Sequence, residues 1–410
     1  MSTRGRRVTP WLAVTVILTG CSRENWEGTT YQRGDTTVVR TLSGSVWGDS
    51  ATLVEEARIG SEDQGPEYVL RGVAALAGGG EGDVYVADAR VPALRVYDKA
   101  GRHKKTIGAP GRGTGTYAVP IGVVLLPDGR IVLSDPSRAQ FNVYSSRGTF
   151  LEEWPQPRNI RLLPPFFLGA DGSLYHRFVY DPRVQPHNRQ FGYVRYSLDG
   201  ELESQMRDPD PTFQPVTLTA VAQSGEVVPF VVPFSPLEHW LLTPQGAILR
   251  GISDEYAVDV TWAEGSVVRL ERVAPPVMAQ KEEIRWHYQR VDRRATEIDY
   301  KWTWRGPVIP ETKPPFKDFF MDRGGRIWVQ LHQPASPVEV LNEDGEPAGQ
   351  RWTEPVAYDV FETGGRYLGH VETPPGFRTI PQPLIEGDVV WAVVRQFEGE
   401  PSVVRFRIDH

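Results

Sequence analysis

Residues 122–135 of the 410-residue chain read Gly-Val-Val-Leu-Leu-Pro-Asp-Gly-Arg-Ile-Val-Leu-Ser-Asp, and they contain the clearest structural pattern in the sequence. An apolar run leads to Asp128-Gly129, and a second run rich in aliphatic residues follows the turn. Asp-Gly between two such runs is typical of a β-hairpin, because both residues tolerate positive φ angles. The stretch therefore predicts two short antiparallel strands joined by a tight turn.

The same pattern recurs along the chain at intervals of about 40 to 50 residues. Comparable turns lie at Glu81-Gly82-Asp83, Asp171-Gly172, Gln245-Gly246 and Gly324-Gly325. A second apolar hairpin follows the first in most units, as at Phe141 to Leu151. Four strands per unit at this period are typical of a β-propeller blade. The sequence therefore predicts an all-β fold, a six-bladed β-propeller with four-stranded blades, over residues 52–410.

The six predicted blades occupy residues 68–110, 117–156, 164–208, 237–273, 315–372 and 384–408. The last of them contains only three apolar runs. Residues 52–59 are strand-like and belong to no other blade, so we expect this N-terminal strand to pair with Val403 to Ile408 and close the ring. Closure would remove the unpaired edges that an open array of sheets exposes.

Two segments depart from the repeat. Residues 209–236 are rich in proline and are predicted to form an irregular extension between the third and fourth blades. An insertion at about 275–310 is predicted to contain one helix within residues 275–295, because Ile284, Tyr288, Val291 and Ala295 fall on one helical face. This helix is either a packed surface decoration or a lid or docking element for a partner.

The stretch from Gly108 to Val143 combines a Gly-rich loop, Tyr117, Pro120, Gly122-Val123, Asp128-Gly129 and Asp135. This order resembles the NHL-repeat family of propellers, and the resemblance implies a propeller for the remainder of the repeat. Arg138 and Gln140 stand where that family usually has an asparagine.

The N-terminus carries Arg4, Arg6 and Arg7, then an apolar run from Trp11 to Leu18 that is too short to span a bilayer. Leu18-Thr-Gly-Cys21 follows and resembles the lipobox of bacterial lipoproteins. The resemblance implies a lipoprotein signal peptide over 1–20, acylation such as palmitate on Cys21, and a lipidated tether over 21–51. Ser22 in place of aspartate implies the outer membrane. A plain secretory signal with a chance cysteine is the alternative.

The composition of the chain restricts the classes of partner that it can bind. The formal charge is −7, and removing the three arginines of the signal gives −7 − 3 = −10. An acidic exported chain is a poor candidate for nucleic acid, which needs a basic face. Cys21 is the only cysteine, so no disulfide can form within the mature chain. The expected partners are the membrane, through the lipid anchor, and a protein or small molecule.

Motifs for catalysis, phosphate binding or a zinc helix are absent from the sequence, which predicts no catalytic residue, no metal and no cofactor. Polar residues at or near the ends of the predicted second strands are the candidates to face a ligand. They are Asp88, Arg90, Asp135, Arg138, His176, Asp254 and His332. Aspartates at such positions also commonly cap turns. The arrangement resembles six-bladed propellers of the gluconolactonase and paraoxonase type, but the mixed residue types disfavour a calcium cage.

These observations favour a membrane-anchored, non-enzymatic binding or scaffolding propeller at the bacterial cell envelope. The alternative is a metal-dependent hydrolase or lyase, lactonase-like, that uses the mouth of the propeller channel.

Overall fold

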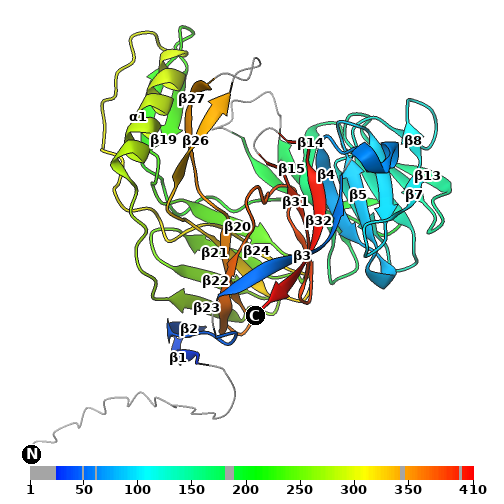
Figure 1. Cartoon of the computed structure of the whole chain (residues 1–410), viewed down its shortest axis with the longest axis horizontal. Helices are drawn as coiled ribbons and strands as arrows, with labels where there is room; N and C mark the ends of the chain where they lie inside the picture. Colours follow the sequence, from blue (N-terminus) through cyan, green and yellow to red (C-terminus); the bar gives the residue numbers. More distant parts are fainter. Residues whose placement is uncertain (1–24, 49, 61, 181–188, 342–346, 397–398) are drawn as a thin grey trace, which may run out of the picture.

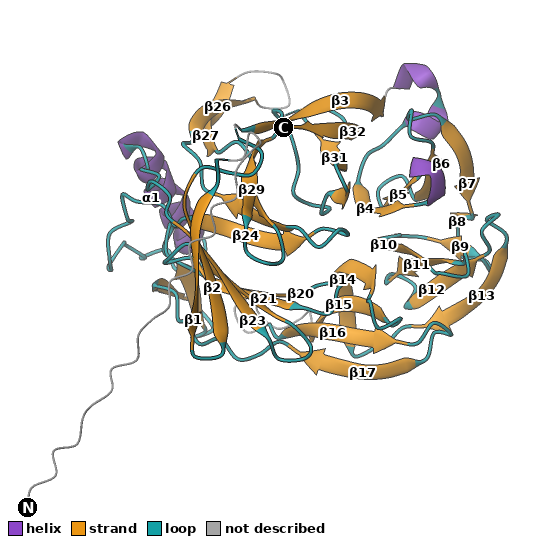
Figure 2. Ribbon diagram, turned by 90° about the horizontal axis from the view of Figure 1, so that it is seen from below, coloured by secondary structure: helices purple, strands orange, loops and turns teal. Residues whose placement is uncertain are grey.

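Antiparallel four-stranded sheets account for most of the computed structural model, which describes residues 25–48, 50–60, 62–180, 189–341, 347–396 and 399–410. Figure 2 shows these sheets placed around a common centre. Cys21 and the predicted signal peptide lie outside the described residues. None of the helices in the described ranges is both long and apolar enough to cross a membrane.

The first three sheets each contain four consecutive strands in sequence order. Their strands are β4 (Val73–Gly78), β5 (Val84–Asp88), β6 (Ala93–Tyr97) and β7 (His103–Ile107); β10 (Gly122–Leu125), β11 (Ile131–Asp135), β12 (Gln140–Tyr144) and β13 (Phe150–Pro155); and β14 (Ile160–Leu168), β15 (Leu174–Tyr180), β16 (Phe191–Tyr196) and β17 (Leu202–Arg207). Gly129 and Gly172 adopt φ angles of 86° and 77°, as the predicted tight turns require. The strand pattern predicted for residues 68–208 is confirmed.

The remaining sheets are built from later parts of the chain. The fourth group contains β20 (Glu238–Leu242), β21 (Ile248–Ile252), β22 (Ala257–Thr261) and β23 (Val267–Arg272); the fifth contains β24 (Phe316–Met321), β25 (Ile327–Leu331), β28 (Ala357–Phe361) and β29 (Tyr367–Glu372); the last contains β30 (Leu384–Glu386), β31 (Val389–Val394), β32 (Ser402–Asp409) and β3 (Ala51–Ile59). Shorter elements are η1 (Glu62–Gln64), η2 (Pro66–Tyr68), η3 (Gly80–Gly82), β8 (Ala109–Pro110) and β9 (Thr116–Tyr117).

The predicted pairing of residues 52–59 with residues 403–408 is confirmed. β3 runs antiparallel to β32, from Leu53 opposite Ile408 to Ile59 opposite Val403. The sequence did not predict a second contact of β3, a short parallel pairing of Ala51 with Val371 in β29. β3 thereby joins the fifth and last groups into one continuous sheet.

Hydrophobic clusters lie between neighbouring sheets. Leu94 of the first group packs with Leu133 of the second, and Trp391 of the last group shares a cluster with Val86 of the first. The first strands lie nearest the centre in Figure 2, where β10 is beside both β4 and β14. Radial sheets packed face to face in this way form a propeller-type fold.

The N-terminal segment is more ordered than a tether. Residues 27–43, within the predicted tether over 21–51, contain β1 (Glu27–Arg33) and β2 (Thr36–Ser43). β2 adds in parallel to β23, the outer strand of the fourth group, from Thr36 opposite Val267 to Thr41 opposite Arg272. Val38 is fully buried there. The chain therefore joins the propeller well before residue 52.

Three inserted segments gather at one end of the molecule (Figure 1). We call them the cap: β18 (Thr217–Val221) with β19 (Val227–Val231), α1 (Lys281–Thr296), and β26 (Ser336–Leu341) with β27 (Pro347–Thr353). The prediction of an irregular extension over 209–236 is wrong, because this segment contains the β18–β19 hairpin. The predicted helix is confirmed but begins at Lys281, where Gln280 and Glu283 form a capping box.

The apolar stripe of α1 explains why the cap holds together. Val291 and Ala295 are buried, and Val291 packs in one cluster with Leu218 of β18 and with Ile309. Trp302 also donates a hydrogen bond of 2.8 Å to the carbonyl oxygen of Thr219. The helix is thus packed against the other insertion rather than directly on the propeller core.

Candidate functional site

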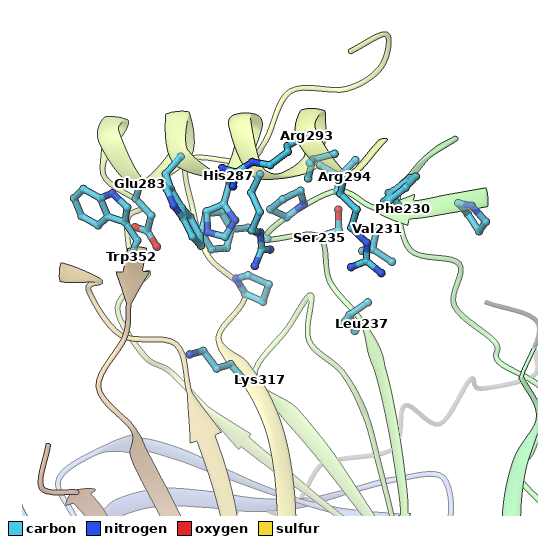
Figure 3. Close-up of a pocket in the computed structure, with 18 of the residues that line it drawn as sticks. Phe230, Val231, Ser235, Leu237, Glu283, His287, Arg293, Arg294, Lys317 and Trp352 are labelled. Atoms are coloured by element: carbon cyan, nitrogen blue, oxygen red, sulfur yellow. The ribbon is translucent and has the colours of Figure 1, made fainter. Parts of the chain in front are cut away.

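A cavity of about 1250 Å³ lies between the cap and the sheets of the fourth and fifth groups. The cap contributes residues of β19, α1 and β27 to its wall, and the sheets contribute His239 of β20, Lys317 of β24 and His332, which follows β25. Figure 3 shows side chains of α1 on one side of this space and Lys317 across from them. Small molecules most often bind to proteins in a concave space of this size, where a few polar groups converge.

A buried lysine fixes the cap to the propeller. Lys313 is 2% exposed, and its Nζ lies 2.6 Å from Oε1 of Glu283 in α1 and 2.9 Å from Oε1 of Glu354 after β27. It also donates a 3.0 Å hydrogen bond to the carbonyl oxygen of Gln333. Each charge is paired and hydrogen-bonded, which a buried ion requires. The network therefore holds two walls of the cavity at a fixed separation.

Glu354 is shared by two lysines and a histidine. Nζ of Lys317 lies 2.6 Å from its Oε2, and Nδ1 of His332 lies 3.1 Å from both carboxylate oxygens. Burial opposes ionisation of Glu354, but the hydrogen bond from His332 and the charge of Lys317 outweigh it and hold its pKa well below the usual range. Glu354 is therefore a carboxylate at neutral pH, already occupied by its neighbours.

His287 of α1 presents an unsatisfied polar atom to the same region. Its Nδ1 is buried and has no hydrogen-bond partner among the described residues. Burial, followed by the charges of Arg290 and Lys313, lowers the pKa of His287 to about 4. The imidazole is therefore neutral at pH 7 and can accept or donate one further hydrogen bond.

Phe234 sits among these groups in a strained conformation. Its φ angle is 60°, in the left-handed region that aromatic residues rarely adopt. The ring centre lies 4.8 Å from the ring of His287 and 6.0 Å from that of His332, and Nζ of Lys313 lies 5.2 Å away. Strained residues of this kind concentrate at binding and catalytic sites.

Of the residues predicted to face a ligand, His332 lines this cavity, and the other six do not. Asp88 and Asp135 are buried, and their carboxylates accept hydrogen bonds from backbone amides. Asp88 accepts hydrogen bonds from the amides of Arg71, Gly72, Arg90 and Val91, and Asp135 accepts one of 2.6 Å from the amide of Ala118. Turn capping is thus their role in the structure. Ser253 takes the equivalent role in the fourth group, with a 2.9 Å bond from the amide of Leu237.

Arg138 and His176 also have structural partners. Arg138 donates to the carbonyl oxygens of Gly113 at 3.1 Å and Thr116 at 2.7 Å, so it ties down the Gly-rich loop. His176 is fully buried, and its Nε2 lies 2.8 Å from Oγ of Ser134. Burial lowers the pKa of His176 to about 3. Arg90 and Asp254 are exposed outside the cavity.

Sequence reasoning missed most of the cavity wall. Glu354 and the arginines of α1 come from insertions that are distant in the sequence, and no motif links them. The amphipathic helix was the one usable signal. Within the part of the chain that the structure describes, no three histidine, cysteine or acidic side chains are placed to hold a metal ion.

No protein-family model matches the chain, and no curated protein matches it. A solved structure of a DUF4221 family member from Bacteroides vulgatus matches with a TM-score of 0.50 at 10% identity, over 88% of this chain and 98% of that one. A candidate exported protein from Bacteroides fragilis gives 0.46 at 9% identity, over 91% and 100%. The WD40 repeats of RRP9 give 0.43 at 11%, over 87% and 100%. At such identities the likeness concerns the fold alone.

Proposed function

We propose that this chain is an exported, lipid-anchored binding protein, and that the cavity beneath the cap is its recognition site. In this proposal the propeller has six blades and is closed by β3, which supplies the outer strand of the last blade. The pairing of β3 with β32 and the cluster that joins Trp391 to Val86 support closure.

The observation that carries the binding role is the cavity of about 1250 Å³ between walls that the Lys313 network fixes. A preformed space loses little entropy when a ligand enters, because the surrounding side chains are already ordered. The cap elements are insertions into the repeat, and together they form a wall that the repeat itself does not need.

The anchor is tested by Cys21→Ser. The wild type should fractionate with membranes and incorporate an alkyne-tagged fatty acid, because Cys21 ends a lipobox-like run. The variant should carry no label and leave the membrane fraction. Ser22→Asp is the matched control, since it should keep the label while the protein moves to the inner membrane of a two-membrane host. A wild type that is wholly soluble with a free Cys21 thiol would contradict the anchor.

Binding is tested on protein purified from its own host under mild detergent. We expect mass spectrometry to detect a co-purifying small molecule in the wild type. Leu237→Trp should deplete that molecule at least severalfold, because Leu237 lines the cavity and is 38% exposed. Leu151→Trp is the control, since Leu151 of β13 is similarly exposed, at 48%, and lies outside the cavity.

Equal amounts of the molecule in all three proteins would contradict the cavity as the recognition site. The paired His332 and Glu354 in the wall are the one observation that favours the hydrolase or lyase alternative. Stoichiometric calcium or zinc in the same wild-type sample would support that alternative over non-enzymatic binding.

A further inference from the structure

Two arginines of α1 line the cavity one helical turn apart. Arg290 and Arg294 are at i and i+4, so they lie on the same side of the helix. Both are exposed, and the two acidic residues Glu283 and Glu354 of the cavity wall pair with Lys313 and Lys317 instead. Partial desolvation of Arg290, and then the charge of Arg294, lower the pKa of Arg290, which as an arginine still stays charged. The two positive charges of this arginine pair repel each other, and an anion bound between them would relieve the repulsion.

Aromatic side chains hold both guanidinium groups. The guanidinium carbon of Arg290 lies 5.1 Å from the ring centre of Trp286, and that of Arg294 lies 5.9 Å from the ring centre of Phe230. A stacked guanidinium keeps its N–H edge available, and that edge matches a carboxylate, sulfonate or phosphate in bidentate fashion. Figure 3 shows Arg294 beside Phe230, close to Val231 and Ser235.

Acidic residues also line the wall, and two of them are taken up by lysines. Glu283 and Glu354 are already paired with Lys313 and Lys317. Glu226 and Glu297 also line the cavity, whereas α1 contributes Arg290, Arg293 and Arg294. The lining holds equal numbers of acidic and basic residues, but three of the basic ones are grouped on α1, so positive charge is concentrated at that part of the wall. Local positive charge on an acidic protein concentrates anions at that place.

Apolar surface lies next to the arginine pair. Val231 and Leu237 are 44% and 38% exposed, and the rings of Trp286, Phe230 and Phe234 form further parts of the same wall. The free Nδ1 of His287 adds one neutral polar group. A ligand that satisfied all of these groups would carry a negative head and an apolar body.

We infer that the cavity takes a small organic anion with an apolar body, and that Arg290 and Arg294 together bind its anionic head. The inference rests on the proposed function, since it assigns a ligand class to the same cavity. Trp286, Phe230 and Val231 of the cap contact the apolar body together with Leu237, which precedes β20.

The test uses two fluorescent probes of nearly the same shape. 8-Anilino-1-naphthalenesulfonate carries an anionic group, and N-phenyl-1-naphthylamine lacks it. The wild type should bind the anionic probe about tenfold more tightly than the neutral one, the scale that a charge-assisted hydrogen-bonded pair supports. The double variant Arg290→Gln/Arg294→Gln should lose that preference and keep its affinity for the neutral probe. The wild-type preference should also weaken as salt is raised.

Arg285→Gln is the matched control, because Arg285 is an exposed arginine of α1 that does not line the cavity. It should leave both affinities unchanged, and thermal melting should show that all variants fold. Equal affinity of the wild type for both probes, or equal losses in the control and the double variant, would overturn the anion assignment and leave the cavity as a binding site. Binding of neither probe would count against both the assignment and the proposed site.

Discussion

Removal of residues 403–410 should leave a chain that does not fold to a stable monomer. These residues make up nearly all of β32, which lies between β31 and β3. Val403, Val404, Phe406 and Ile408 are each no more than 3% exposed. Burial of one such side chain contributes about 1.5–3 kcal/mol, so their joint loss approaches the total stability of about 5–15 kcal/mol. The truncation would also leave the edges of β3 and β31 unpaired.

The measurement is size-exclusion chromatography and thermal melting of the truncated protein, which we expect to aggregate. Two point variants separate packing from chain length. Phe406→Ala should cost about 3–5 kcal/mol, the range for a large aromatic removed from a core. Arg407→Ala, on the opposite and half-exposed face, should change stability by less than about 1 kcal/mol. A monomeric truncation with an unchanged melting temperature would show that β3 does not close the ring.

Lys313→Met should destabilise the protein by about 3–5 kcal/mol, because it leaves the buried carboxylate of Glu283 without its cation. Glu283 would lose its ion-pair partner, whereas Glu354 would keep Lys317 and His332. The effect should therefore centre on α1. Hydrogen exchange should show faster exchange in residues 281–296 than in β24, and thermal melting should give the overall loss.

Glu283→Met added to Lys313→Met is the informative second variant. It removes the uncompensated carboxylate and replaces the buried pair with apolar side chains of similar size, an exchange that is often neutral. We expect it to recover at least half of the lost stability. If the double variant were as unstable as the single one, the cap would not depend on the charge balance at Lys313.

The sequence predicted features that depend on neighbouring residues or on the repeat better than features that depend on other tertiary contacts. The turns at Gly129 and Gly172 are local, since two residues fix them, and the strands around them were predicted correctly. The pairing of β3 with β32 spans most of the chain, yet it was predictable because the last blade lacked a strand. The β1–β2 hairpin was missed. It lies outside the repeat, and its pairing with β23 is a tertiary contact that no sequence pattern indicates.

The site was harder to predict for the same reason. Asp88 and Asp135 have residue types that suit ligands, but neighbouring backbone amides take up their oxygens. His332 was a candidate to face a ligand and does line the cavity, whereas its partner Glu354 follows an inserted hairpin. The wall of the cavity depends on how three insertions pack together, and no single stretch of sequence encodes that packing.

The docking of β2 on β23 also sets how the protein would stand on a membrane. With a lipid on Cys21, only residues 21–26 would separate the bilayer from β1, a reach of at most about 20 Å for an extended chain. A tether that ran to residue 51 could reach about 100 Å and would let the body tumble. Figure 1 shows β1 and β2 at the opposite end of the molecule from α1. The anchored protein would therefore keep a restricted height and orientation, with the cap directed away from the lipid, so that its ligand would arrive from the aqueous phase.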